Sequence, residues 1–116
     1  MLGRHIIIDV KNIKDSELIY LCDVKELDDM FFSSVPDYLE LEVVKQCRFQ
    51  FKPFGGTILY LLTTSHASIH TFVEEHSFSM DIFTCSEDVN LLDILDYIKR
   101  FWDVTDSDIQ YRLIER

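Results

Sequence analysis

The chain has 116 residues, a formal net charge of −10 and a hydrophobic fraction of 47%. This length fits a single domain over residues 1–116, and the apolar content excludes a disordered chain. The negative charge argues against nucleic acid and anionic membrane surfaces as partners, because both are bound by clustered Lys and Arg. No apolar run reaches the length of a membrane span, and residues 1–10 predict a first strand rather than a signal peptide.

The first half of the chain predicts a strand, a helical segment and a second strand. Residues 4–10 are rich in β-branched side chains and predict the first strand, whereas residues 11–21 are ambiguous and have room for a short helical turn. Residues 24–34 carry apolar side chains at helical spacing, and Pro36 is expected to end that pattern. Residues 39–51 alternate apolar and polar side chains, which predicts a half-buried strand.

Three further strands are predicted in the middle of the chain. Residues 57–62 are apolar throughout and predict a central strand, which follows a turn signal at residues 53–56. Residues 67–73 and 77–85 predict two more strands, joined by a turn.

The C-terminal part predicts the clearest helix, over residues 88–102, and then a last strand over residues 108–115. Ser86, Asp88 and Asn90 are rival N-cap candidates. The element order β-α-β-β-β-β-α-β predicts an α+β, two-layer sandwich, in which helices cover one face of an antiparallel sheet. The apolar face of the helix is expected to consist of Leu91, Leu92, Leu95, Ile98 and Trp102.

Residues 63–72, TTSHASIHTF, concentrate hydroxyl and imidazole side chains between apolar segments. Gly-x-Ser-x-Gly is absent, which excludes a hydrolase elbow, although a triad of Ser65, His70 and Asp81 stays a minor alternative. His66 and His70 share a face of the expected strand but match no standard zinc spacing, so no metal site is predicted. Either histidine alone fits a buried side chain that is bonded to the main chain.

The cysteines and phenylalanines each allow a structural and a functional interpretation. Cys22, Cys47 and Cys85 form an odd set without Cys-x-x-Cys spacing, which favours free thiols in the cytoplasm. Cys85 is either a small buried hydrophobe or a proton donor. Phe51 and Phe72 are either core aromatics or a clamp for a planar or cationic ligand.

Gly-Arg-His at residues 3–5, TSHASIHTFVE at residues 64–74 and DIFTC at residues 81–85 together carry a family resemblance. They resemble the prokaryotic S-adenosylmethionine decarboxylases, pyruvoyl-dependent enzymes with a two-layer α+β fold. The resemblance covers most of the chain and is strongest over residues 51–85. Three matched segments at the right mutual spacing are more specific than any one motif.

The resemblance implies that the chain cleaves itself. Ser65 would attack the carbonyl of Thr64 and convert the amide into an ester. β-Elimination would then divide the chain into residues 1–64 and residues 65–116, and residue 65 would become a pyruvoyl group. His70 matches the histidine that moves a proton during this processing reaction.

The matched positions also imply a substrate, S-adenosylmethionine. Its amine would form a Schiff base with the pyruvoyl carbonyl, which acts as an electron sink during loss of CO₂. Cys85 matches the proton donor, and Thr57 matches a serine that assists processing. Phe51 and Phe72 match the side chains that sandwich adenine, and Glu74 matches the acid that binds the ribose hydroxyls.

The resemblance further implies a homodimer of processed protomers whose product, S-adenosylmethioninamine, supplies spermidine synthesis. Four positions depart from the family pattern: Thr64 replaces glutamate, Val73 proline, Ser86 glycine and Thr57 serine. Two alternatives stay open. One is a pyruvoyl-dependent ornithine or arginine decarboxylase, and the other is an unprocessed, non-catalytic regulatory relative.

Overall fold

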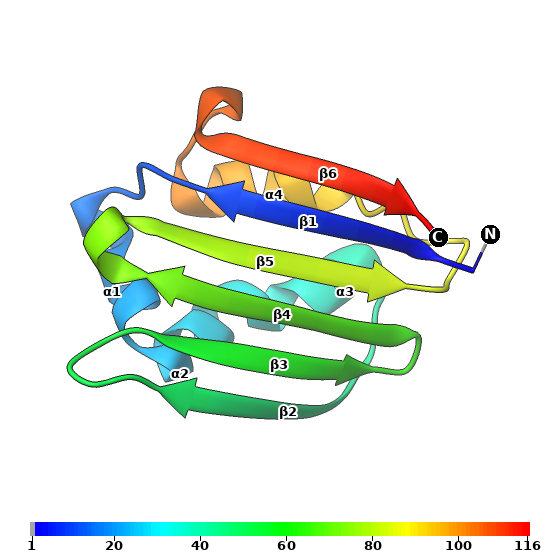
Figure 1. The fold of residues 1–116 in the computed structure, drawn as a ribbon, viewed down its shortest axis with the longest axis horizontal. Helices are drawn as coiled ribbons and strands as arrows, with labels where there is room; N and C mark the ends of the chain where they lie inside the picture. The colour runs from blue at the N-terminus through cyan, green and yellow to red at the C-terminus, as the bar shows by residue number, and fades with distance from the viewer. Residues whose placement is uncertain (1) are drawn as a thin grey trace.

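The computed structural model describes residues 2–116 and contains a six-stranded sheet in the order β2-β3-β4-β5-β1-β6 (Figure 1). Every neighbouring pair of strands is antiparallel. The helices lie behind one face of the sheet and leave the other face uncovered. This arrangement confirms the predicted two-layer α+β sandwich. The strands are β1 (Arg4–Val10), β2 (Val43–Gln50), β3 (Gly56–Leu62), β4 (Ser65–Phe72), β5 (Ser77–Thr84) and β6 (Ile109–Glu115).

The helical layer is built from short elements and one longer helix. A π-helical turn over Leu27–Phe31 lies between the second and third helices. None of the helices in residues 2–116 is long and apolar enough to cross a membrane. The helices are α1 (Leu18–Cys22), α2 (Val24–Glu26), α3 (Val35–Leu39) and α4 (Asp93–Trp102).

The prediction that Pro36 ends the first helical segment is wrong. Pro36 lies in the first turn of α3, where the N–H that proline lacks has no helical partner in any case. Helix α3 ends instead at Leu39, and the residue that caps it, Glu40, has a left-handed φ of 57°. Strand β2 therefore begins only at Val43, and Leu41 packs in the core ahead of it.

Helix α4 begins at Asp93, five residues later than the sequence pattern predicts. Asn90, rather than Ser86 or Asp88, organises the turn before it, because its Oδ1 accepts a hydrogen bond from the Leu92 N–H at 3.2 Å. The apolar face is also rotated from the predicted one, since Leu92 is 39% exposed. The side chains that α4 and its preceding turn bury are Leu91, Ile94, Ile98 and Trp102.

Alternation along the strands decides which side chains meet the helices. Ile6 and Ile8 of β1 and Ile58 of β3 are fully buried against the helical layer. Burial of each such side chain stabilises the fold by about 1.5–3 kcal/mol. The intervening residues point to the uncovered face of the sheet.

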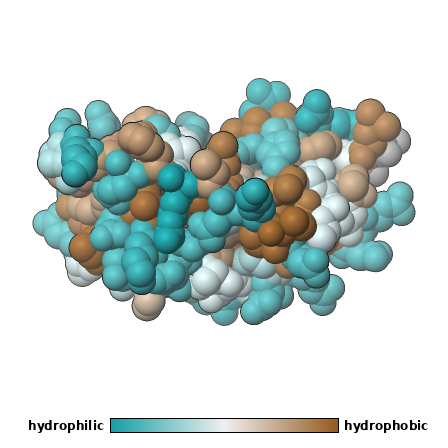
Figure 2. Space-filling model, turned by 90° about the horizontal axis from the view of Figure 1, so that it is seen from below, coloured by the Kyte–Doolittle hydropathy of each residue, from teal (hydrophilic) through white to brown (hydrophobic). Residues whose placement is uncertain are grey.

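The uncovered face carries large apolar side chains. Phe49, Leu59 and Leu61 are 66%, 54% and 53% exposed. Figure 2 shows the molecule from the side of the β2 edge, where hydrophobic surface is broken up by hydrophilic side chains. The predicted central strand, β3, is thus second from the edge of the sheet and buried on only one face.

Candidate active site

The junction between β3 and β4 holds the peptide bond that the sequence singles out. Ser65, the first residue of β4, has a φ of 149°, a conformation that residues with a side chain seldom adopt. Backbone strain of this kind costs about 1–3 kcal/mol and persists only where surrounding structure enforces it. Neighbouring groups must therefore hold the Thr64–Ser65 junction in this conformation.

Cys85 supplies those groups from the end of β5. Its main-chain N–H donates to the carbonyl oxygen of Thr64 at 3.0 Å, and its thiol donates to the same oxygen at 3.2 Å. Two donors on one carbonyl resemble an oxyanion hole, because they polarise the carbonyl and would stabilise negative charge on its oxygen. The carbonyl next to Ser65 is thus prepared for attack by a nucleophile.

The side chain of Thr64 is held as well. Thr84 is completely buried, and its hydroxyl donates to Thr64 Oγ1 at 3.0 Å. The Thr84 hydroxyl in turn accepts from the Ser86 main-chain N–H at 3.1 Å. Sequence reasoning did not find Thr84, although its place next to Cys85 in DIFTC was a signal. The threonine at position 64 therefore has a hydroxyl partner of its own.

A second group of predicted residues gathers on the uncovered face of the sheet, at the other end of β4. Thr57 and His70 are direct partners on β3 and β4, with 2.5 Å between Thr57 Oγ1 and His70 Nδ1. The rings of Phe51 and Phe72 both lie near the imidazole, with centroids 5.5 and 4.6 Å from that of His70. Aromatic faces and a hydroxyl–imidazole pair thus meet at one place.

Glu74 belongs to this second group through a shallow hollow. The hollow has a volume of about 180 Å³ and is lined by residues 54–55 and 71–75, which include Phe72 and Glu74. The main chain runs close beneath it. Gly55 has a φ of 93°, and a Cβ there would lie 3.2 Å from Thr71 Oγ1. An aromatic ring and a carboxylate therefore border one opening.

The two groups do not meet within one copy of the chain. Ser65 and His70 stand at opposite parts of β4, and five residues of extended strand separate them by roughly 17 Å. The family resemblance implies that both residues act in one processing reaction. A single chain does not bring them into contact, so their joint action requires another source of His70.

Asp81 is engaged elsewhere, which removes the alternative triad of Ser65, His70 and Asp81. Its carboxylate bonds to His5 Nε2 at 2.6 Å and accepts from the hydroxyl of Ser68. The His5–Asp81 pair is a site feature that sequence reasoning missed, although His5 belongs to the Gly-Arg-His segment. The pair lies on the uncovered face of the sheet, between β1 and β5.

His66, and not His70, lies next to the His5–Asp81 pair. The potential ligand atoms of His5, His66 and Asp81 lie within 4.8 Å of one another, and no other such group occurs among residues 2–116. A cation bound there would have to displace the existing His5–Asp81 hydrogen bond. His70 bonds to Thr57 instead, so the two histidines that share a strand face have separate partners.

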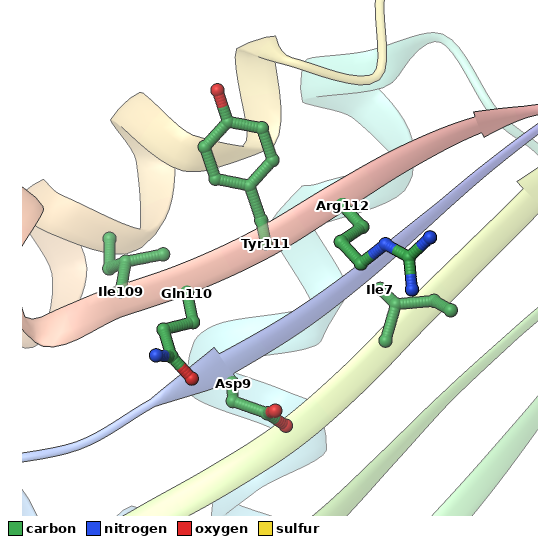
Figure 3. Close-up of a pocket in the computed structure, with 6 residues that line it drawn as sticks. All are labelled: Ile7, Asp9, Ile109, Gln110, Tyr111 and Arg112. Atoms are coloured by element: carbon green, nitrogen blue, oxygen red, sulfur yellow. The ribbon is translucent and has the colours of Figure 1, made fainter.

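A hollow on the β1–β6 side of the sheet contains none of the predicted site residues. It has a volume of about 530 Å³ and extends across β1 and β6 (Figure 3). Ile7, Asp9 and Arg112 extend over the sheet there, while Tyr111 points to the opposite side of β6. The hollow is a shallow part of the sheet surface, so the candidate site stays with the two groups described above.

Comparison with known proteins gives a consistent result. A family model described as S-adenosylmethionine decarboxylase matches residues 4–115. An S-adenosylmethionine decarboxylase proenzyme 2 from Bacillus cereus is 35% identical over 101 residues, which cover 83% of this chain and 75% of the relative. A proenzyme from Archaeoglobus fulgidus is 36% identical over 87 residues, or 75% of this chain and 74% of the relative.

A solved structure matches the fold over almost the whole chain. The crystal structure of the adenosylmethionine decarboxylase from Aquifex aeolicus superimposes with a TM-score of 0.81. The match covers 99% of this chain and 90% of that one, at 27% sequence identity.

Proposed function

The chain belongs to the S-adenosylmethionine decarboxylase family, and on that premise we propose that it is a self-processing decarboxylase of S-adenosylmethionine that serves polyamine synthesis. The observation that carries the proposal is the Thr64 carbonyl, which accepts from the N–H and the thiol of Cys85 beside a strained Ser65. The three free cysteines fit a cytoplasmic enzyme.

The first step is an acyl shift at the junction. Ser65 Oγ attacks the Thr64 carbonyl carbon, and the Cys85 N–H stabilises the oxyanion that forms. The amide C–N bond breaks, and an ester joins the two residues. Relief of the strained φ at Ser65 favours this step, because the main chain at that point is no longer an amide.

The second step breaks the chain. A base removes the α-proton of residue 65, the Cβ–O bond breaks, and Thr64 leaves as a C-terminal carboxylate. Hydrolysis of the resulting enamine, with loss of ammonia, leaves a pyruvoyl group at residue 65. The products are fragments of residues 1–64 and 65–116. Ser65 fits the role of precursor because its carbonyl neighbour is already polarised.

Once formed, the pyruvoyl group supplies an electron sink for the electrons that the departing CO₂ leaves behind. The residues of the chain bind the substrate and move protons. Cys85 lies beside residue 65 and returns a proton to the substrate α-carbon. Phe51 and Phe72 hold the adenine and offer their faces to the nearby sulfonium, and Glu74 binds the ribose hydroxyls.

The base for processing comes from a second copy of the chain. Two uncovered sheet faces can pack about 10 Å apart around a two-fold axis that runs across the strands. That axis brings the Thr57–His70 end of one copy over the Ser65–Cys85 end of the other. The exposed Leu59 and Leu61 become buried between the sheets. A homodimer with two composite sites therefore explains why one chain separates the two groups.

Denaturing intact-mass spectrometry of freshly purified protein tests the proposal, with Ser65→Ala as the matched control. We expect two fragments divided between Thr64 and Ser65, the second with a pyruvoyl end, and a single uncut mass for the variant. Release of CO₂ from S-adenosylmethionine, against arginine and ornithine, then tests the substrate. A wild-type chain that stays uncut on long incubation would contradict the proposal.

A further inference from the structure

The start of β1 is fastened to the segment that follows Cys85. Arg4 Nη2 donates to the main-chain oxygen of Ser86 at 3.1 Å and to that of Glu87 at 3.0 Å. These contacts join residues that are more than eighty positions apart in the sequence. The Gly-Arg-His segment is therefore part of the structure around the proton donor.

Gly3 allows the close approach that the contact needs. A Cβ at Gly3 would lie 2.8 Å from the Thr84 oxygen and 2.9 Å from the ring of Phe83, and both distances are too short for real contacts. The chain before Arg4 thus runs directly against the end of β5. A small hollow of about 20 Å³ remains between residues 2–4 and 85–87.

The residues directly after Cys85 lie outside the core, and Val89 is the first residue of this segment to be buried. The segment leaves the sheet at Thr84, and regular structure resumes only with α4 at Asp93. Arg4 places two charge-assisted hydrogen bonds at the point where the chain departs, and such bonds are stronger than neutral ones. The N–H of Ser86 is bonded to Thr84, so Ser86 is held from both sides.

We propose that Arg4 is a positioning residue for Cys85, which acts by fixing the main chain of Ser86 and Glu87 so that the thiol stays at the Thr64–Ser65 junction. This inference rests on the proposed function. The guanidinium binds no atom of Thr64 or Ser65, so its effect passes through the position of Cys85. Because cleavage would place Arg4 and Cys85 in different fragments, the contact would also hold the two fragments together at the active site.

The proposal predicts a specific kinetic effect. Arg4 bonds to the main-chain oxygens of Ser86 and Glu87, whereas the proposed substrate contacts of Phe51, Phe72 and Glu74 would come from the second copy of the chain. Loss of Arg4 should therefore lower kcat for S-adenosylmethionine severalfold and leave KM unchanged. Arg4→Lys keeps a cationic donor and should restore part of kcat, whereas a variant that merely damages the fold would not show this split.

A first experiment measures the thiol without any need for catalysis. In the uncleaved Ser65→Ala chain, the rate of alkylation of Cys85 by iodoacetamide is compared with that of Cys47, an exposed thiol on β2. Arg4→Ala should raise the ratio of the two rates severalfold, because Cys85 loses its fixed bond to Thr64. Arg100→Ala on α4, which removes another bonded guanidinium, should leave the ratio unchanged.

The steady-state kinetics of Arg4→Ala, Arg4→Lys and Arg100→Ala complete the test. An unchanged alkylation ratio in Arg4→Ala overturns the inference, and so does a normal kcat in an active enzyme. If the wild-type chain neither cleaves nor releases CO₂, the proposed function fails by itself. The alkylation ratio then shows whether Arg4 positions Cys85 in the uncleaved protein.

Discussion

Ser65 and His70 share strand β4, yet five residues of extended chain keep the serine hydroxyl and the imidazole apart. Their separation predicts complementation between two inactive variants. His70→Ala keeps Ser65, and Ser65→Ala keeps His70. In a mixed dimer, the His70→Ala chain meets the intact histidine of its partner copy, so we expect cleavage of that chain alone.

Mass spectrometry of the two variants, incubated separately and then mixed, measures this complementation. Each variant should stay uncut by itself. Treatment of His70→Ala with hydroxylamine distinguishes the steps, because an accumulated ester is cleaved and an amide is not. Efficient self-cleavage of His70→Ala without its partner would show that His70 has no part in processing.

Cys85→Ala should separate processing from turnover. The variant keeps the main-chain N–H that bonds to the Thr64 oxygen, so we expect cleavage at close to the wild-type rate. It loses the proposed proton donor, and kcat should fall by about 10²–10⁴-fold, the usual contribution of general acid catalysis. Assays of CO₂ release measure kcat, with Cys47→Ala as the control for loss of an exposed thiol.

The same variant should also protonate the wrong atom more often. Misplaced protonation transfers the amine to residue 65. The fragment of residues 65–116 then has the mass expected for an N-terminal alanine instead of a pyruvoyl group. This mass should accumulate during turnover in Cys85→Ala and much less in the wild type. Unchanged CO₂ release by Cys85→Ala would remove Cys85 from the role of proton donor.

Local patterns in the sequence were sufficient to predict the sheet, whereas the candidate site residues were assigned through the family resemblance. The apolar run of residues 57–62 and the strand-forming composition of residues 77–85 predicted β3 and β5, and the shared face of His66 and His70 followed from a period of two. The helix boundaries failed where a local signal had more than one structural outcome. Pro36 was tolerated inside a first helical turn, and Asn90 moved the start of α4.

The distribution of the site over two groups could not be predicted from spacing. The resemblance assigned Ser65 and His70 to one processing reaction, but a strand converts the five residues between them into a long separation. Arg4 and His5 are distant in sequence from Cys85 and Asp81, so only the pairing of β1 with β5 brings them together. Such contacts depend on strand order, which no local pattern contains.

Glu74→Gln should weaken substrate binding more than it slows the chemistry. The carboxylate borders the same hollow as Phe72, and a hydrogen bond to a charged group contributes about 1.5–3 kcal/mol. KM for S-adenosylmethionine should therefore rise by about tenfold or more, with a smaller change in kcat. Glu75→Gln removes the same charge one residue away, and an equal rise in its KM would contradict a specific bond from Glu74.

Asp108 should make stability depend on acid pH. The Thr105 main-chain N–H and the Asn12 side chain donate to its carboxylate and hold its pKa below the ordinary 3.8. Because the folded pKa is depressed, the stabilisation is present above the unfolded value and is lost as the pH falls through the folded one. The free energy of unfolding of Asp108→Asn should therefore fall less steeply as the pH decreases, which is a flatter acid limb of the stability curve.

Urea unfolding over a series of acid pH values measures that limb. The control is Asp88→Asn, at an exposed carboxylate that has no side-chain hydrogen bond within residues 2–116. Its acid limb should follow the wild type. An Asp108→Asn protein with an unaltered acid limb would show that the Thr105 and Asn12 contacts do not distinguish the charged from the neutral carboxyl.

Tyr60→Phe should destabilise the contact between the π-helical turn and the sheet. The Tyr60 hydroxyl donates to Asp28 Oδ1 at 2.7 Å, and burial together with that carboxylate raises the pKa of Tyr60, so it stays a donor. Without the Tyr60 hydroxyl, the largely buried carboxylate of Asp28 keeps, within residues 2–116, only its contacts with the side chains of Gln46 and Arg48. The free energy of unfolding should fall by about 1–3 kcal/mol in urea, whereas Tyr111→Phe, at a half-exposed ring, should change it little. Equal stability of Tyr60→Phe and wild type would mean that water replaces the hydroxyl at Asp28 without loss.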